Sequence, residues 1–163
     1  MIYLDNNATT MPAPEVVAAM LPYLGELYAN PSSAHHAGMA VKQAIGQARG
    51  NVAGLIGAKP AEITFTASAT EANHLAILGT LRARTERRHV VTTAVEHPSS
   101  LALFRELAGQ GYHVTVLPVD GEGRIRRHDL ASVVSSDTAL VSVMWANNET
   151  GVLMPVLEAA QIA

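Results

Sequence analysis

Ile63-Thr64-Phe65-Thr66-Ala67-Ser68-Ala69-Thr70-Glu71-Ala72-Asn73 is the stretch that decides the fold. Its short apolar opening, rich in β-branched and aromatic residues, predicts a strand over 63–66. Two small residues then turn the chain, and the apolar spacing that follows predicts a helix over about 70–82. A strand that leads at once into a helix is typical of a sheet covered by helices.

Strands and helices alternate on the carboxyl-terminal side of this stretch, and two helices precede it. Gly57 is expected to end the second of those two helices. The predicted elements are helices over 14–24, 41–56 and 99–109, strands over 89–94, 113–117 and 139–144, a turn over 120–123, and a last helix that begins at Pro155. This order predicts an α/β fold, a three-layer α/β/α arrangement with a mostly parallel sheet.

The composition narrows the class of protein. Of the 163 residues, 48% are hydrophobic and 15% are charged, which is typical of a folded domain. No apolar run approaches the roughly 20 residues that cross a bilayer, and the start of the chain lacks the pattern of a secretory signal, so a cytoplasmic location is expected. The net charge of −3 disfavours nucleic acid as a partner. Because there is no cysteine and the seven histidines are scattered, no metal site is expected.

Polar residues follow three of the predicted strands. They are the Ala69-Thr70 turn, the pair Glu96-His97, and the run Asn147-Asn148-Glu149. Each has a local explanation as the alternative: a helix cap for Thr70, an ordinary loop position for His97, and a turn for the asparagines. Ligands of open parallel sheets bind at the carboxyl ends of the strands, however, and a helix start there suits a phosphate. Taken together, the three groups indicate a ligand pocket.

The same residues carry a resemblance to a known family. The motifs, in chain order, are Leu4-Asp5-Asn6-Asn7-Ala8-Thr9-Thr10, Asn30-Pro31-Ser32-Ser33-Ala34-His35, Ala69-Thr70-Glu71, Glu96-His97 and Met144-Trp145-Ala146-Asn147-Asn148-Glu149-Thr150-Gly151. With these motifs the chain resembles, over its whole length, the cysteine desulfurases of fold type I in the class V aminotransferase superfamily. The first and last motifs are most similar to the NifS-type branch.

The resemblance implies a cofactor, pyridoxal 5′-phosphate, and a role for each matching residue. Ala69 through its backbone N–H, and Thr70 through its N–H and hydroxyl, would hold the cofactor phosphate. His97 would lie against the pyridine ring as the catalytic residue that helps to move protons. Asn148 would bind the phenolic oxygen of the ring, and Asn30 would line the substrate side. No metal is implied.

The implied reaction removes sulfur from L-cysteine, which leaves L-alanine and an enzyme persulfide for iron–sulfur cluster assembly, with nitrogenase maturation as the expected purpose. The implied partners are an iron–sulfur scaffold protein and a second copy of the chain in a homodimer. Residues 1–13 would contribute to a small domain and to the substrate side. Residues 14–163 would form part of the cofactor-binding large domain.

Two features depart from the family. Ser68 stands where the family usually has glycine, which questions how tightly the phosphate turn can close. The family's later portion supplies a Schiff-base lysine, an aspartate for the ring nitrogen, a nucleophilic cysteine and an arginine. The only lysines here, Lys42 and Lys59, match no such position. We therefore expect a truncated enzyme that is inactive alone.

Three alternatives stay open on the sequence. The chain could belong to a selenocysteine lyase or an aminotransferase of the same superfamily, because the missing segments separate these enzymes. It could also be a non-catalytic remnant that binds a scaffold partner. A nucleotide-binding module is disfavoured, because no G-x-G-x-x-G run and no P-loop lysine follow any predicted strand.

Overall fold

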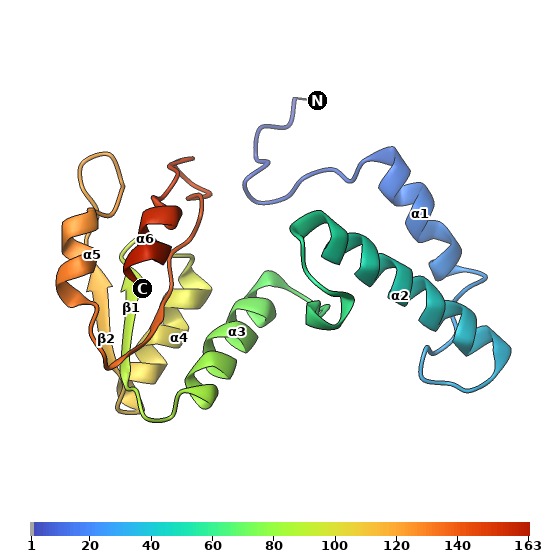
Figure 1. The fold of residues 1–163 in the computed structure, drawn as a ribbon. Helices are drawn as coiled ribbons and strands as arrows, with labels where there is room; N and C mark the ends of the chain where they lie inside the picture. The colour runs from blue at the N-terminus through green and yellow to red at the C-terminus, as the bar shows by residue number, and fades with distance from the viewer. Residues whose placement is uncertain (1) are drawn as a thin grey trace. The chain divides into compact units, whose positions relative to one another are not determined.

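The computed structural model describes residues 2–163, which form two compact units that divide between Phe65 and Thr66 (Figure 1). The sequence placed a boundary after Ala13, between a small-domain segment and the large domain. The predicted boundary after Ala13 is not the boundary between the two compact units, and the assignment of residues 1–13 to a small domain stays a prediction.

The first unit is helical. Helix α1 spans Pro14–Leu24, with proline at its first position, and α2 spans His36–Ile56, followed by the short 3₁₀ helix η1 at Pro60–Glu62. Helix α2 ends where expected, because Gly57 adopts a φ of 68°, the left-handed conformation that glycine tolerates. The unit has little core: α1 buries none of its residues, and α2 buries only Gly38, Val41 and Ala53.

The second unit is built on a three-stranded parallel sheet in the order β2-β1-β3. The central strand β1 spans His89–Thr93, β2 spans His113–Leu117 and β3 spans Thr138–Val141. All five residues of β1 are buried, as a strand covered on both faces requires. The predicted parallel sheet is confirmed in this unit.

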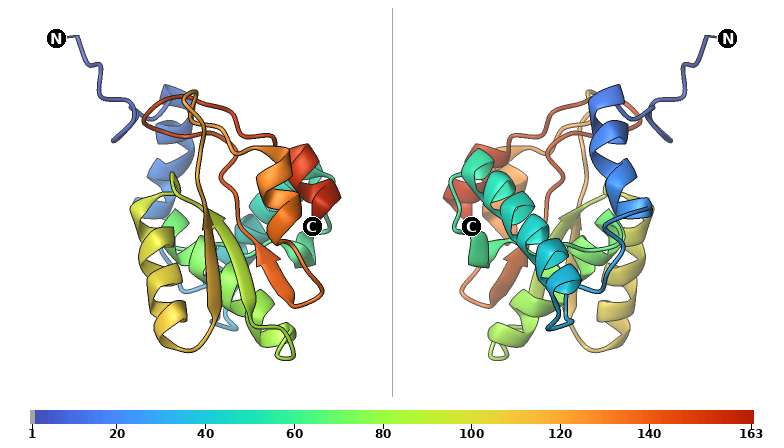
Figure 2. Two further views of the ribbon diagram at one scale, coloured as in Figure 1. Left: turned by 90° about the vertical axis from the view of Figure 1, so that its left-hand side faces the viewer. Right: turned by 90° about the vertical axis from the view of Figure 1, so that its right-hand side faces the viewer.

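Helices cover both faces of this sheet. Helices α3 (Ala69–Ala83) and α4 (Pro98–Gly109) pack on the face that carries Val90, whereas α5 (Arg127–Val133) and α6 (Val156–Ile162) pack on the face that carries Val91 (Figure 2). Because successive side chains of a strand point to opposite faces, two neighbouring valines serve two separate cores. The three-layer α/β/α prediction is confirmed for this unit.

Some predicted elements differ from the structure. The strand predicted over 63–66 is wrong: this segment is irregular and pairs with no strand among the described residues. Apolar, β-branched composition favours an extended chain, but a strand also needs a neighbour with which to exchange hydrogen bonds. Strand β3 ends at Val141 rather than at Met144. Helix α5 was not predicted, because its seven residues contain only two large apolar side chains, Leu130 and Val133, which are too few to establish a period.

Candidate active site

The amino end of α3 presents backbone donors. Ala69 and Thr70 are the first two helical residues, so the helix itself offers no carbonyl partner for their N–H groups. Ser68 caps the helix by accepting the N–H of Glu71 at 3.2 Å, and the Glu71 carboxylate accepts the N–H of Ala67 at 2.7 Å. The hydroxyl of Ser68 therefore serves the helix, and two N–H groups and the hydroxyl of Thr70 are the donors that this turn offers to an anion.

His97 follows β1 and caps α4. Its Nδ1 accepts the backbone N–H of Ser99 at 3.2 Å and lies 2.7 Å from the hydroxyl oxygen of the same serine. A ring nitrogen that accepts an N–H must carry a lone pair, so these bonds assign the proton of the neutral imidazole to Nε2. The ring is thereby oriented by its own helix start, with Nε2 as its donor.

Glu96 precedes His97 and is buried, with 9% of its surface exposed. Its Oε1 accepts the hydroxyl of Thr93 at 3.1 Å and the backbone N–H of Met144 at 2.6 Å. Burial raises the pKa of this carboxyl, and the hydrogen bonds from Met144 and Thr93 partly oppose that rise. Neither of the ion pairs among the described residues involves Glu96. The carboxylate therefore joins the end of β1 to the segment after β3 through hydrogen bonds alone.

Asn147 organises the loop after β3. Its Nδ2 donates to the carbonyl of Val95 at 3.0 Å, and its Oδ1 accepts the N–H groups of Glu149 and Thr150, both at 2.9 Å. The neighbouring Asn148 is exposed, and its Nδ2 donates to the Glu149 carboxylate at 3.0 Å. The amide of Asn147 is thus turned toward the loop after β1.

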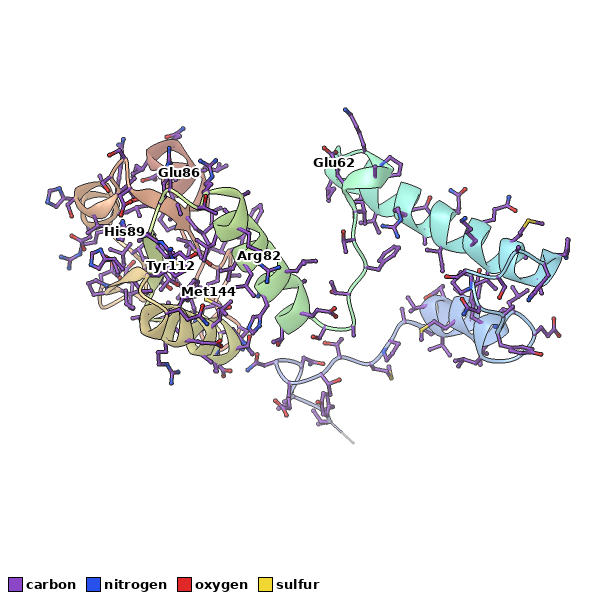
Figure 3. The ribbon with its side chains drawn as sticks, turned by 90° about the horizontal axis from the view of Figure 1, so that it is seen from below. Glu62, Arg82, Glu86, His89, Tyr112 and Met144 are labelled. Carbon is purple, nitrogen blue, oxygen red and sulfur yellow. The ribbon has the colours of Figure 1, made fainter. Side chains whose placement is uncertain are left out.

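A cavity of about 350 Å³ opens beside these loops. Glu96, His97 and Met144 line it, together with side chains of α3, α4 and the end of β3 that include Asn73, Thr80, Ser100 and Ser142. Met144 lies within the second unit, as Figure 3 shows. The lining mixes hydroxyls, an amide, an imidazole and a carboxylate with aliphatic side chains, so the cavity suits a polar ligand that carries an apolar ring.

The structure places one of the predicted site residues in the lining of the cavity. His97 lines the cavity, whereas Ala69, Thr70 and Asn148 lie outside its lining. Helices α3 and α4 are nevertheless neighbours on one face of the sheet, and Nε2 of His74, in the second turn of α3, lies 3.3 Å from the carbonyl oxygen of Ser99. The cofactor-binding roles of these residues stay predictions.

Asn30 belongs to the first unit, so its predicted place on the substrate side also stays a prediction. Its side chain accepts the N–H of Ser32 at 2.8 Å, within the turn that leads into α2. Gly38 packs closely on this turn: a Cβ at that position would lie 2.5 Å from the carbonyl oxygen of Ser33 and 2.7 Å from that of Asn30. The turn is therefore held by its own side chain and by a close backbone contact.

Sequence reasoning treated Glu96 as a residue that meets a ligand and gave Asn147 no role of its own. In the structure both residues are structural links between the loops after β1 and β3. A carboxylate three residues after a buried strand was the available signal, because a buried group of that kind must find hydrogen bonds. Among residues 2–163, no group of three or more His, Asp or Glu side chains is placed to hold a metal ion. No helix in the same range is both long and apolar enough to cross a membrane.

The parallel sheet, the helix starts and the polar loops beyond β1 and β3 define a class of protein. The chain belongs to the aminotransferase class-V family, whose sequence model matches residues 2–163. Within that family it is similar to cysteine desulfurases. It is 53% identical over 156 residues to cysteine desulfurase 2 of Trichormus variabilis, and the aligned part covers 96% of this chain and 39% of the relative. It is 50% identical over 163 residues to cysteine desulfurase NifS of Azotobacter vinelandii, and the aligned part covers 99% of this chain and 40% of the relative.

Solved structures agree with these relatives. A NifS-like protein superposes with a TM-score of 0.95 at 36% identity, over 99% of this chain and 44% of the other. A structure described as SspA in complex with cysteine superposes with a TM-score of 0.93 at 34% identity, over 99% of this chain and 47% of the other. The resemblance to cysteine desulfurases is confirmed, and the chain spans about two fifths of the length of the curated relatives that it matches.

Proposed function

We propose that this chain forms part of a pyridoxal-phosphate-dependent cysteine desulfurase and supplies one side of its cofactor site. The observation that carries the proposal is the meeting of the loops after β1 and β3 beside a cavity that side chains of α3 also line. The sequence identity of about 50% to cysteine desulfurases supports cysteine desulfuration as the reaction of this site.

The donors of the site fit the chemistry of the cofactor. The N–H groups of Ala69 and Thr70, with the Thr70 hydroxyl, suit a phosphate dianion at a helix start. The amides after β3 suit a phenolic oxygen, with Asn148 as the residue assigned from the resemblance and Asn147 as its inner neighbour. Pyridoxal phosphate, when bound, supplies an electron sink for bond cleavage at an amino-acid substrate.

His97 is the catalytic residue in this proposal. Its ring lines the cavity, its Nδ1 is held by Ser99, and its Nε2 carries the proton in the neutral ring. A ring fixed in this way can lie against a flat aromatic ligand and can donate or accept a proton at one defined atom.

The substrate and partners follow from the proposed reaction. L-cysteine would lose its sulfur, which an iron–sulfur scaffold protein would accept, in the cytoplasm and with nitrogenase maturation as the purpose. A homodimer is proposed for the whole enzyme. Support for further protein contacts comes from α1, which buries none of its residues and leaves Met20, Leu21 and Leu24 at least half exposed.

The test measures binding of pyridoxamine 5′-phosphate, which cannot condense with the amines of Lys42 and Lys59 as an aldehyde would. Trp145, the single tryptophan, stands in the loop after β3 and reports binding by fluorescence quenching. We expect saturable quenching, and Thr70→Val should weaken it about tenfold, since one hydrogen bond to a charged group is lost.

Thr85→Val is the matched control, because Thr85 is an exposed threonine beyond the other end of α3. It should leave the affinity unchanged. Binding that does not saturate in the unaltered chain, or equal affinities for the chain and its Thr70→Val variant, would contradict the proposed phosphate site.

A further inference from the structure

Two side-chain hydrogen bonds join the loops after β1 and β3, and in both of them the loop after β3 supplies the donor. Glu96, from the loop after β1, accepts the N–H of Met144, and Asn147, from the loop after β3, donates to the carbonyl of Val95. These bonds span 48 and 52 residues of the chain. The two loops are thus connected beyond the point where the strand ladder of β1 and β3 ends.

Glu96 and Asn147 are each next in the chain to a residue of the proposed site. Glu96 is directly followed by His97, whose ring is fixed by Ser99. Asn147 is directly followed by Asn148 and orders that loop by accepting the N–H groups of Glu149 and Thr150. A shift of either loop would therefore move His97 relative to the amides.

We propose that Glu96 is a positioning residue, whose buried carboxylate holds the loop after β3 against the loop after β1 so that His97 and the paired amides face one ligand. The inference rests on the proposed function for the identity of that ligand. It assigns Glu96 no contact with the ligand and no proton transfer.

The carboxylate is suited to this task. Its Oε1 accepts two hydrogen bonds, one from the Thr93 hydroxyl at the end of β1 and one from the Met144 N–H at 2.6 Å. Bonds to a charged acceptor are shorter and stronger than bonds between neutral groups. Since Glu96 is 9% exposed, water cannot readily replace it as the acceptor for Met144.

A carboxylate that merely stabilised the second unit would explain the same burial. The two roles differ in what a substitution disturbs. A positioning role affects residues 144–150 and His97, whereas general stabilisation affects amides throughout the sheet. Amide hydrogen exchange, resolved by residue, separates these patterns.

The experiment compares Glu96→Ala, Glu96→Gln and the control Glu158→Ala, an exposed glutamate of α6. In Glu96→Ala we expect exchange at Met144 to quicken about tenfold, exchange at Glu149 and Thr150 to quicken as well, and pyridoxamine 5′-phosphate to bind about tenfold more weakly. Glu96→Gln keeps an acceptor oxygen and should restore most of both losses. The control should match the unaltered chain.

Two outcomes overturn the inference: unchanged exchange at Met144, Glu149 and Thr150 in Glu96→Ala, or an equal rise at every amide of the sheet. Should Glu96→Ala fail to fold, the amide proton of Met144 decides, because it should move upfield in Glu96→Gln when the charged acceptor is lost. An unmoved Met144 signal would overturn the inference. If the unaltered chain binds no pyridoxamine 5′-phosphate, the proposed function fails, while the exchange pattern still decides whether Glu96 positions the loops.

Discussion

His89, the first residue of β1, lies buried at the end of the sheet opposite to the proposed site. Its Nδ1 is 2.8 Å from the hydroxyl oxygen of Thr138 on β3, and its Nε2 is 2.9 Å from that of Thr115 on β2. Its ring also stacks on His113, with centroids 4.8 Å apart (His89 is labelled in Figure 3). One imidazole therefore links all three strands.

Burial lowers the pKa of His89 below the ordinary value of 6.5, the nearby His113 lowers it further, and Asp137 opposes both. The unfolded chain then binds more protons than the folded chain between that lowered pKa and 6.5. The contribution of His89 to the free energy of unfolding should therefore be complete above about pH 6.5. As the pH falls through this window, the free energy of unfolding should decline.

The measurement is urea unfolding, followed by circular dichroism between about pH 5 and pH 8, a span that brackets the ordinary histidine pKa. His89→Gln should flatten the decline, because an amide keeps hydrogen-bonding groups without titrating. His128→Gln, at an exposed histidine of α5, should leave the decline as it is. An undiminished decline in His89→Gln would assign the effect to other groups.

At the scale of elements, the start of α3 combines a structural and a proposed functional role. Ser68 caps the helix through the N–H of Glu71, which satisfies a donor that the family's usual glycine cannot reach with a side chain. Its φ of −159° is extended backbone that any residue adopts, so serine is not strained there. The concern that serine would distort the phosphate turn finds no support in this backbone.

Replacement of Ser68 should separate two contributions to the stability of α3: the hydrogen bond that its hydroxyl accepts from Glu71, and the preference of its backbone for the extended conformation of a helix cap. Ser68→Ala should lower the free energy of unfolding by about 1 kcal/mol, and Ser68→Gly by only a few tenths of a kcal/mol, as is usual for caps. Urea unfolding of the three chains at one pH measures both differences. Equal losses for alanine and glycine, or no loss for alanine, would show that the Ser68 hydroxyl contributes little to α3.

At the scale of the whole molecule, the chain contains no cysteine, and its two lysines both lie in the first unit. Sulfur transfer from L-cysteine requires a thiolate nucleophile, which this chain does not contain. We therefore expect the 163-residue chain to release neither alanine nor sulfide from L-cysteine when pyridoxal 5′-phosphate is added.

The assay follows alanine and sulfide over many equivalents of protein, with the Azotobacter vinelandii relative as the active control. Weak binding of the cofactor without turnover is the expected result. Catalytic release of alanine by this chain alone would contradict the assignment of the reaction to residues outside it.

The sequence by itself determined the local elements and the family. Helix α1 begins at Pro14, α2 ends at Gly57, and β2 spans the predicted residues, because proline, glycine and apolar spacing act over a few neighbouring residues. The polar motifs identified the resemblance to cysteine desulfurases for the same reason, since each motif is a short run of consecutive residues. The strand predicted over 63–66 failed because strand pairing is not a local property.

Only the tertiary structure decided which polar residues meet. β2 follows β1 in the chain, yet the sheet order β2-β1-β3 places β3 on the other side of β1. That order brings Met144 to the carboxylate of Glu96 and the amide of Asn147 to Val95, across 48 and 52 residues. Such bonds depend on how strands that are distant in sequence are ordered in the sheet, and no spacing within a motif encodes that order.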